Sequence, residues 1–237
     1  MDDYLVWLFA SFYIMCYSYG YYIQVFLMMK TRSAEGLSIN SQILNIVSIL
    51  CYLFYSLFRV THIDKNIVSI LDMISAIHIS FISSFVLVLT LYYPRCKNKY
   101  EYSTGFIIAI VASMCCLCYW ISQNGYAVSV KDLALFVGLN EVIIDGMQNI
   151  YQVFLNADKQ STKGFAIDII IGEAMASFFV IIEVSIESQT TEMKELNIPK
   201  LALAIIILST DAIILYQHYY CYRKDRMLIN KQPELRQ

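Results

Sequence analysis

Six acidic residues of this chain lie inside long apolar segments, where a charge is costly to hold. They are Asp72, Glu141, Asp145, Asp168, Glu173 and Asp211. Insertion scales put an aspartate at the centre of a membrane helix at about 2.5–3.5 kcal/mol unfavourable, so acids in such places are candidates for function. The same segments hold no lysine or arginine at depth that would pair with them. Burial penalises the charged form of a carboxylic acid, so unpaired acids of this kind bind protons readily. The pattern predicts proton-coupled transport, in which an acid is protonated on one side of a membrane and deprotonated on the other.

The composition of the chain indicates that these segments cross a membrane. Of its 237 residues, 58% are hydrophobic and only 15% are charged, and the mean hydropathy is +0.56. Seven apolar runs have about the 20 residues that a helix needs to span a bilayer. They cover residues 4–29, 36–58, 66–94, 102–130, 133–156, 164–182 and 201–222. We therefore predict an all-α membrane protein with seven transmembrane helices.

The distribution of cations predicts how these helices are oriented. If the loops alternate between the two sides, 12 of the 17 lysines and arginines fall on one side and the remaining five on the other. Cytoplasmic loops carry the excess of lysine and arginine, so the N-terminus is expected in the lumen or outside the cell and the C-terminus in the cytosol. The net charge of −2 argues against nucleic acid as a partner.

A repeated stretch divides the chain into two halves. The segment IQVFLMMKTRSAEGLSI at residues 23–39 returns 128 residues later as YQVFLNADKQSTKGFAI at residues 151–167. Seven of the 17 positions are identical where chance gives roughly one, which indicates an internal duplication. We predict two three-helix repeats, residues 1–94 and 131–222, joined by a linker helix at 95–130 and followed by a cytosolic tail at 223–237. A single linker helix makes the two three-helix bundles parallel, and transporters built in this way hold their substrate between the halves.

Helical spacing arranges the polar residues in stripes. Steps of three and four residues put one set on a single face of the fifth helix: Glu141, Asp145, Gln148, Gln152 and Asn156. A matching stripe on the first helix is largely aromatic: Tyr13, Tyr17, Tyr21, Gln24 and Met28. Both stripes are expected to face a pocket or a water path, because lipid cannot satisfy them. The 128-residue offset also superposes Asn45 on Glu173.

Other polar residues receive plainer interpretations. His78 and His218 are interpreted as polar contacts between packed helices, and Glu183 and Glu187 as solvated carboxylates near a helix end. No residue set suggests a metal or another cofactor, and no nucleophile, base and orienting partner occur together, so an enzyme is the weakest of the function classes.

The two related stretches resemble PQ-loops, the signature of a family of small seven-helix transporters, and residues 199–224 are similar to the last helix of its proton-coupled cystine exporters. The resemblance implies substrate contacts at Asn45, Asn156 and Glu173, and proton coupling through Asp211, Asp72 and Glu173. It further implies that the pocket is bordered by Tyr17, Tyr21 and Lys200. Two repeated glutamines, Gln24 and Gln152, are assigned to the substrate site with them.

The chain departs from that family pattern at several positions. Ile23 and Tyr151 stand where each PQ-loop has its proline, so any bending of these helices is expected at Gly20 and Gly146. Glu141 and Gln148 occupy positions at which the cystine exporters have lysines, which alters the charge of the pocket.

The function expected from the sequence is proton-coupled export of L-cystine from the lysosome or vacuole lumen to the cytosol by alternating access. The partners are then a small-molecule substrate and protons. A transporter of another amino acid, cationic or neutral, and a non-transporting membrane receptor remain the alternatives.

Overall fold

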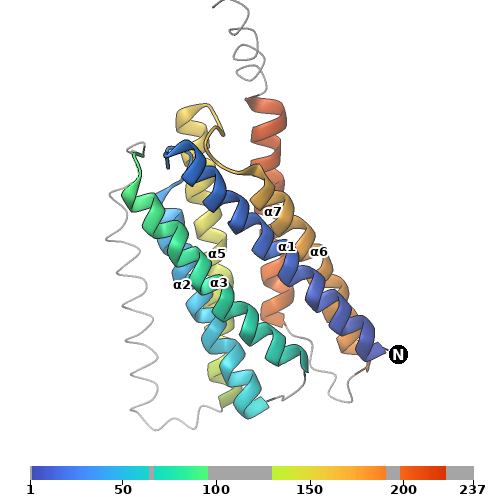
Figure 1. The fold of residues 1–237 in the computed structure, drawn as a ribbon. Coiled ribbons are helices and arrows are strands. Elements are labelled where there is room, and N and C mark those ends of the chain that lie inside the picture. The colour runs from blue at the N-terminus through green and yellow to red at the C-terminus, as the bar shows by residue number, and fades with distance from the viewer. Residues whose placement is uncertain (1, 64–66, 96–129, 191–197, 223–237) are drawn as a thin grey trace, which may run out of the picture.

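The computed structural model describes residues 2–63, 67–95, 130–190 and 198–222 (Figure 1). Within these ranges the protein is all-α, and no β-strand occurs. Its helices are α1 (Asp2–Thr31), α2 (Ile39–Phe58), α3 (Ile67–Tyr92), α5 (Val130–Lys159), α6 (Ile167–Thr190) and α7 (Ile198–Tyr216), with π-helical turns η1 (Arg59–Ile63) after α2 and η3 (Gln217–Cys221) after α7. The all-α prediction is confirmed for these residues. The run at 102–130, expected to form the linker helix, lies outside them apart from its last residue, so the seven-helix count stays a prediction.

Four segments of the described chain are long and apolar enough to cross a membrane. They are Ile39–Thr61, Ile70–Tyr92, Ile167–Ile186 and Ile198–Cys221. The helices α1 and α5 are longer, at 30 residues each, but less apolar. The former carries six tyrosines and the latter carries the acids and amides of its polar stripe. The residues of the two polar stripes face the protein interior, as the next section describes, whereas Tyr4, Tyr19 and Tyr22 of α1 are exposed. The low hydropathy of the two helices therefore reflects in part the site that they build.

The duplication is preserved in the local structure. The first helix of each half ends at Thr31 or Lys159, and the second begins at Ile39 or Ile167, so both boundaries are 128 residues apart. The residue after each first helix, Arg32 or Gln160, is left-handed, with φ of 50° and 49°. A left-handed residue at this place is a common way to end a helix.

The six described helices also pack in a repeated pattern. In the first half α3 contacts both α1 and α2, and in the second half α7 contacts both α5 and α6. The halves meet where α1 packs along α6 and α2 packs along α5 (Figure 1). Exchanging the halves leaves these contacts unchanged, so a pseudo-two-fold axis relates the two repeats.

Two glycines bring α1 and α6 close together. A Cβ atom on Gly20 would lie 2.7 Å from the Cα atom of Ile169, and one on Gly172 would lie 2.7 Å from the carbonyl oxygen of Cys16. Small residues allow such backbone approach between membrane helices. Gly20 therefore serves helix packing, while bending of the helices at Gly20 or Gly146 stays a prediction.

Candidate functional site

A cavity lies between the two halves and takes lining residues from all six described helices. The volume of this cavity, counted as the space that the centre of a water molecule can occupy, is about 70 Å³. One water molecule needs roughly 10–15 Å³ by this measure, so there is room for several. We call this the central cavity. Its polar lining consists of Tyr13, Tyr17, Ser48, Tyr52, Ser75, Glu141, Asp145, Ser177 and Lys200.

The acids of the central cavity come from the α5 stripe. Glu141 and Asp145 line the cavity, and all five residues of the stripe are buried inside the protein. The Ser48 hydroxyl of α2 is 3.3 Å from Oδ1 of Asp145 and 3.4 Å from the carbonyl oxygen of Glu141. The prediction that this face of the fifth helix points inward is confirmed.

A smaller second pocket lies nearer the two PQ-loops, and we call it the inner pocket. It is lined by Tyr21 and Gln24 of α1, Asn45 of α2, and Glu173 of α6, among others. The Tyr21 hydroxyl donates to Oδ1 of Asn45 at 3.0 Å, and Nδ2 of Asn45 is 3.4 Å from the hydroxyl oxygen of Ser83 in α3. The structure thus brings the superposable residues Asn45 and Glu173 to one pocket. Because Tyr13 and Tyr17 line the central cavity, four of the five residues of the α1 stripe line one of the two pockets. The fifth, Met28, is buried in an apolar cluster.

The second half replaces a hydrogen-bonded pair of the first half with two carboxyl groups. The offset of 128 relates Asn45 to Glu173 and Ser83 to Asp211. Asp211 is fully buried, and within the described residues neither of its carboxyl oxygens has a hydrogen-bond partner. Glu173 and Asp211 interact electrostatically with each other, and Asp145 interacts with both. The two halves therefore differ in their ionisable groups at these equivalent positions.

The repeated glutamines hold the two halves together beside the PQ-loops. Gln24 Oε1 accepts from the backbone N–H of Ala166 at 2.8 Å, and Gln152 Oε1 accepts from that of Ser38 at 3.2 Å. These two bonds are related by the 128-residue offset. Gln152 also donates to the carbonyl oxygen of Gly36 at 2.8 Å. Both glutamines line the inner pocket, but their bonds tie each first helix to the loop of the other half.

The two loop glycines touch at the same end of the molecule. A Cβ atom on Gly36 would lie 1.9 Å from the carbonyl carbon of Gly164, and Gly164 has a φ of +86°. We call this region the loop end. The glycine contact and the glutamine bonds close the loop end between the halves.

Asn156 lies beyond the lining of both cavities. It is buried, accepts from Gln152 Nε2 at 3.1 Å and donates to Oε1 of Gln217 at 3.2 Å. In this conformation it joins α5 to the end of α7, and its role as a substrate contact stays a prediction.

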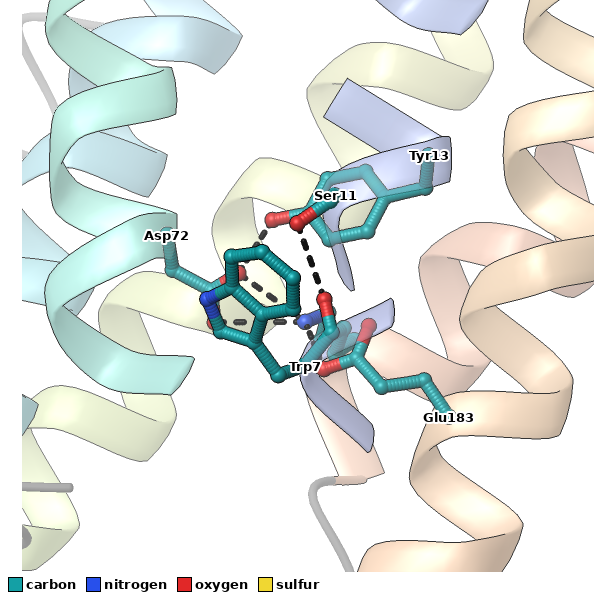
Figure 2. Close-up of polar contacts among 6 residues, drawn as sticks. Trp7, Ser11, Tyr13, Asp72 and Glu183 are labelled. Carbon is teal, nitrogen blue, oxygen red and sulfur yellow. Dashed lines mark hydrogen bonds and ion pairs between the residues drawn. The ribbon is translucent and has the colours of Figure 1, made fainter. Parts of the chain in front are cut away.

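Lys200 is the centre of a buried ionic cluster at the opposite end of the site. Its ammonium lies 2.9 Å from Oδ1 of Asp72 in α3 and 2.8 Å from Oε1 of Glu183 in α6. Figure 2 shows the two carboxyl groups pointing toward each other from these helices. Tyr13 of α1 donates its hydroxyl to Asp72, and its ring lies 4.6 Å from the ammonium. We call these four residues the Lys200 cluster.

Two sequence expectations are wrong at this cluster. Asp72 has a cation partner, and Glu183 is completely buried instead of solvated. The reason is that Lys200, three residues into α7, reaches across the boundary between the halves, which hydropathy along the chain does not reveal. Asp72 and Lys200 are 128 residues apart, so they are equivalent positions meeting at the pseudo-two-fold axis. The 128-residue offset between Asp72 and Lys200 is the sequence signal from which their contact could have been predicted.

The remaining candidates lie away from the cavities. The Tyr22 hydroxyl is 3.3 Å from Nε2 of His78, which is the expected polar contact between packed helices. The Thr162 hydroxyl is 2.6 Å from Nδ1 of His218, so His218 contacts the loop between α5 and α6. Asp168 is exposed in the first turn of α6, which is a place favourable to an acid, and it does not enter the site. Among the described residues, no group of three or more metal-ligating side chains comes together.

Comparison with known proteins agrees with this geometry. Residues 5–63 match the family model of the PQ loop repeat. The chain thus carries a PQ loop repeat in its first quarter. It is 22% identical over 234 residues to a cystinosin homolog from Arabidopsis thaliana, a match that covers 92% of this chain and 85% of the plant protein. It is 20% identical to cystinosin from Drosophila melanogaster, again over 92% of this chain but over only 59% of the fly protein. These similarities agree with a multi-pass membrane protein, as do the four apolar helical segments of the described chain.

Proposed function

We propose that this PQ-loop protein exports an amino acid from the lumen of a lysosome or vacuole to the cytosol, coupled to protons and by alternating access. L-Cystine is the first candidate substrate, because the similar proteins from Arabidopsis and Drosophila are named for cystinosin. The N-terminus is lumenal and the C-terminus cytosolic in this proposal, in keeping with the excess of cations in alternate loops.

The observation that carries the proposal is the carboxyl pair of Glu173 and Asp211. These acids interact with each other and stand where the first half has Asn45 and Ser83, which satisfy one another by a hydrogen bond. Interacting carboxyl groups that are buried away from water favour protonation, because ionising both of them is costly. If Glu173 and Asp211 served only helix packing, an amide and a hydroxyl like those of Asn45 and Ser83 would suffice at their positions. The pair therefore supports a site that binds a proton and releases it.

Alternating access in this proposal starts from the conformation in which the loop end is closed. With the loop end closed, substrate and proton reach the central cavity and the inner pocket from the lumen. Neutralising the pair of Glu173 and Asp211 lowers the cost of enclosing it, which favours rearrangement of the two halves. The glutamine bonds and the contact of Gly36 with Gly164 then separate, and substrate and proton leave to the cytosol. Tyr17 and Tyr21, which lie between the two pockets, border this path.

Transport by purified protein in proteoliposomes tests the proposal. Uptake of labelled L-cystine should be faster when the external solution is acidic than at equal pH, and a protonophore should abolish the difference. Asp211→Asn should remove the dependence on the gradient, whereas Asp168→Asn, which removes an exposed acid from the neighbouring helix, should preserve it. Equal uptake with and without the gradient would reject proton coupling. If no amino acid is transported or stabilises the protein against heat, the receptor alternative is favoured instead.

A second candidate substrate is a cationic amino acid. Glu141 and Asp145 place two acids on the wall of the central cavity, and the cation in its described lining, Lys200, already contacts two carboxyl groups. L-Cystine carries equal numbers of positive and negative groups, so its recognition needs both signs. Competition of uptake by L-lysine and L-arginine separates the two candidates.

A further inference from the structure

Three glutamines of the inner pocket have a side-chain atom that no described residue satisfies. They are Gln24 of α1, Gln42 of α2 and Gln148 of α5, which are 0%, 8% and 6% exposed and all line the pocket. Within the described part of the chain, Nε2 of Gln24 and the Oε1 atoms of Gln42 and Gln148 have no hydrogen-bond partner. Leaving buried polar groups without a partner is costly, so three of them around one pocket indicate a bound molecule.

The size and the chemistry of the inner pocket fit a single water molecule. Its volume, counted in the same way as that of the central cavity, is about 20 Å³, and one water molecule needs roughly 10–15 Å³. Oε1 of Gln24 accepts from the backbone N–H of Ala166, which fixes the nitrogen as the unsatisfied end of this amide. A water molecule can accept from this donor and donate to the two glutamine oxygens, whereas a metal ion or an ammonium group cannot accept from Gln24.

The same pocket lies beside the carboxyl pair. Glu173 lines it, and because the pocket is small, a molecule held there lies next to the Glu173 carboxyl group. Gln24 also connects the pocket to the loop end through its bond to Ala166. The site therefore lies between the pair of Glu173 and Asp211 and the side at which the proposed transport releases its proton.

The ionisable groups that act on Glu173 offer no basic acceptor for that proton. They are the carboxyl groups of Asp145 in α5 and Asp211 in α7, and the phenols of Tyr17 and Tyr21 in α1. Among the described residues that line the inner pocket there is no lysine, arginine or histidine, and α2 and α3 contribute only uncharged side chains. A proton that leaves Glu173 toward the loop end thus needs an acceptor other than a basic side chain.

We propose that Gln24, Gln42 and Gln148 bind one water molecule, and that this water takes the proton of Glu173 on its way to the cytosol. In this step the O–H bond of the carboxyl group breaks, the water oxygen takes the proton, and Glu173 is left as a carboxylate. When the loop end opens, the hydronium ion passes a proton to cytosolic water, which restores the bound water. The direction of this transfer rests on the proposed transport function. The glutamines are positioning residues, because they act through the water.

Infrared difference spectroscopy of the purified protein tests this site without a transport assay. A step from acidic to neutral pH should remove the carboxyl C=O band of Glu173, which is identified by its absence in Glu173→Gln. The same step should change a narrow O–H stretching band, distinct from that of bulk water, which moves to lower frequency when H₂¹⁸O replaces ordinary water. The isotope measurement uses the wild-type protein, so the inference stays testable if a glutamine variant does not fold.

Glutamine-to-leucine variants test the water ligands. Gln42→Leu and Gln148→Leu each remove one acceptor, so the isotope-sensitive band should be lost and the Glu173 carboxyl band should shift, because its water partner is no longer held. Gln160→Leu makes the same change at an exposed glutamine of the loop end and should leave both bands as in the wild type. In proteoliposomes, Gln42→Leu should slow gradient-driven uptake of labelled L-cystine roughly tenfold, the size of one lost hydrogen bond.

The inference is overturned if the pH step gives no band that responds to H₂¹⁸O, if it leaves the Glu173 carboxyl band unchanged, or if Gln42→Leu and Gln148→Leu both keep the wild-type spectra. Wild-type uptake by Gln42→Leu would also overturn it. The proposed transport function fails on a different result: uptake that ignores the pH gradient, together with the expected spectra, would reject that function and leave the water site in place. Gradient-driven uptake without the expected spectra would keep the function and remove the water.

Discussion

Substituting Gly36 by alanine should force the loop end apart. The added Cβ atom would lie 1.9 Å from the carbonyl carbon of Gly164 and 2.2 Å from the backbone nitrogen of Phe165, whereas ordinary contacts begin at 3.4 Å. The backbones must therefore separate by about 1.5 Å, the difference between 3.4 and 1.9 Å, and neither can yield by rotating a side chain. Overpacking of this kind costs about 1–3 kcal/mol. A cost of about 2 kcal/mol that applies only to the closed loop end changes its population relative to the open form by roughly thirtyfold.

Labelling of a reporter cysteine measures this shift. Ala166 is 4% exposed, and its backbone N–H bonds to Gln24 across the loop end. In a background without the seven native cysteines, Ala166→Cys should react slowly with a polar maleimide in the otherwise unchanged protein. Adding Gly36→Ala should accelerate the reaction by roughly tenfold or more.

A second glycine provides the control. A Cβ atom on Gly146 would lie 3.2 Å from the terminal Cγ2 atom of Ile206, a side-chain atom that can move. Gly146→Ala should therefore leave the labelling rate at Ala166→Cys nearly unchanged. If Gly36→Ala also leaves the rate unchanged and the protein stays folded, the two loops are not in contact in the resting protein and the closed loop end is wrong.

Three further outcomes follow from the site. Gln152→Leu should open the loop end more than Gln24→Leu, measured by the same labelling. Gln152 bonds to Ser38, Gly36 and Asn156, whereas Gln24 bonds to Ala166, and each buried group left unsatisfied costs about 1–3 kcal/mol. Equal labelling rates in the two variants would contradict these contacts. Lys200→Met leaves the carboxyl groups of Asp72 and Glu183 without their shared cation, and it should lower the free energy of unfolding by about 3–5 kcal/mol, seen as a large drop in thermal stability. Asp72→Lys alone should abolish transport by placing two lysines at the axis, and combining it with Lys200→Asp should restore part of the transport activity. If the double variant restores none, Asp72 and Lys200 have roles beyond their ion pair.

The sequence predicts the local structure of this protein well because duplication repeats local signals. The first helices end at Thr31 and Lys159, within three residues of the predicted runs, and their left-handed following residues Arg32 and Gln160 repeat at the same offset although the sequence did not predict them. The stripe that begins at Glu141 was also predicted to face inward, since helical spacing alone fixes which residues share a face.

The sequence does not predict the contacts that cross between the halves. Hydropathy along the chain makes Glu183 look like a solvated residue near a helix end, and it makes Asp72 look unpaired, because neither has a cation nearby in sequence. Lys200 joins them only when α7 packs beside α3 and α6, which is a property of the tertiary structure. The hydrogen bond of Asn156 to Gln217 could not be predicted either, since the two residues are 61 positions apart in the sequence.

The pairing of Asp72 with Lys200 has an evolutionary meaning. These two residues occupy the same position in the two repeats and lie 2.9 Å apart at the pseudo-two-fold axis. In a symmetric dimer of identical three-helix chains, that position would bring aspartate against aspartate or lysine against lysine. Their opposite charges are compatible with two halves that have diverged and not with two identical ones. The ion pair therefore makes each repeat specific for the other, and it disfavours assembly of either half with a copy of itself.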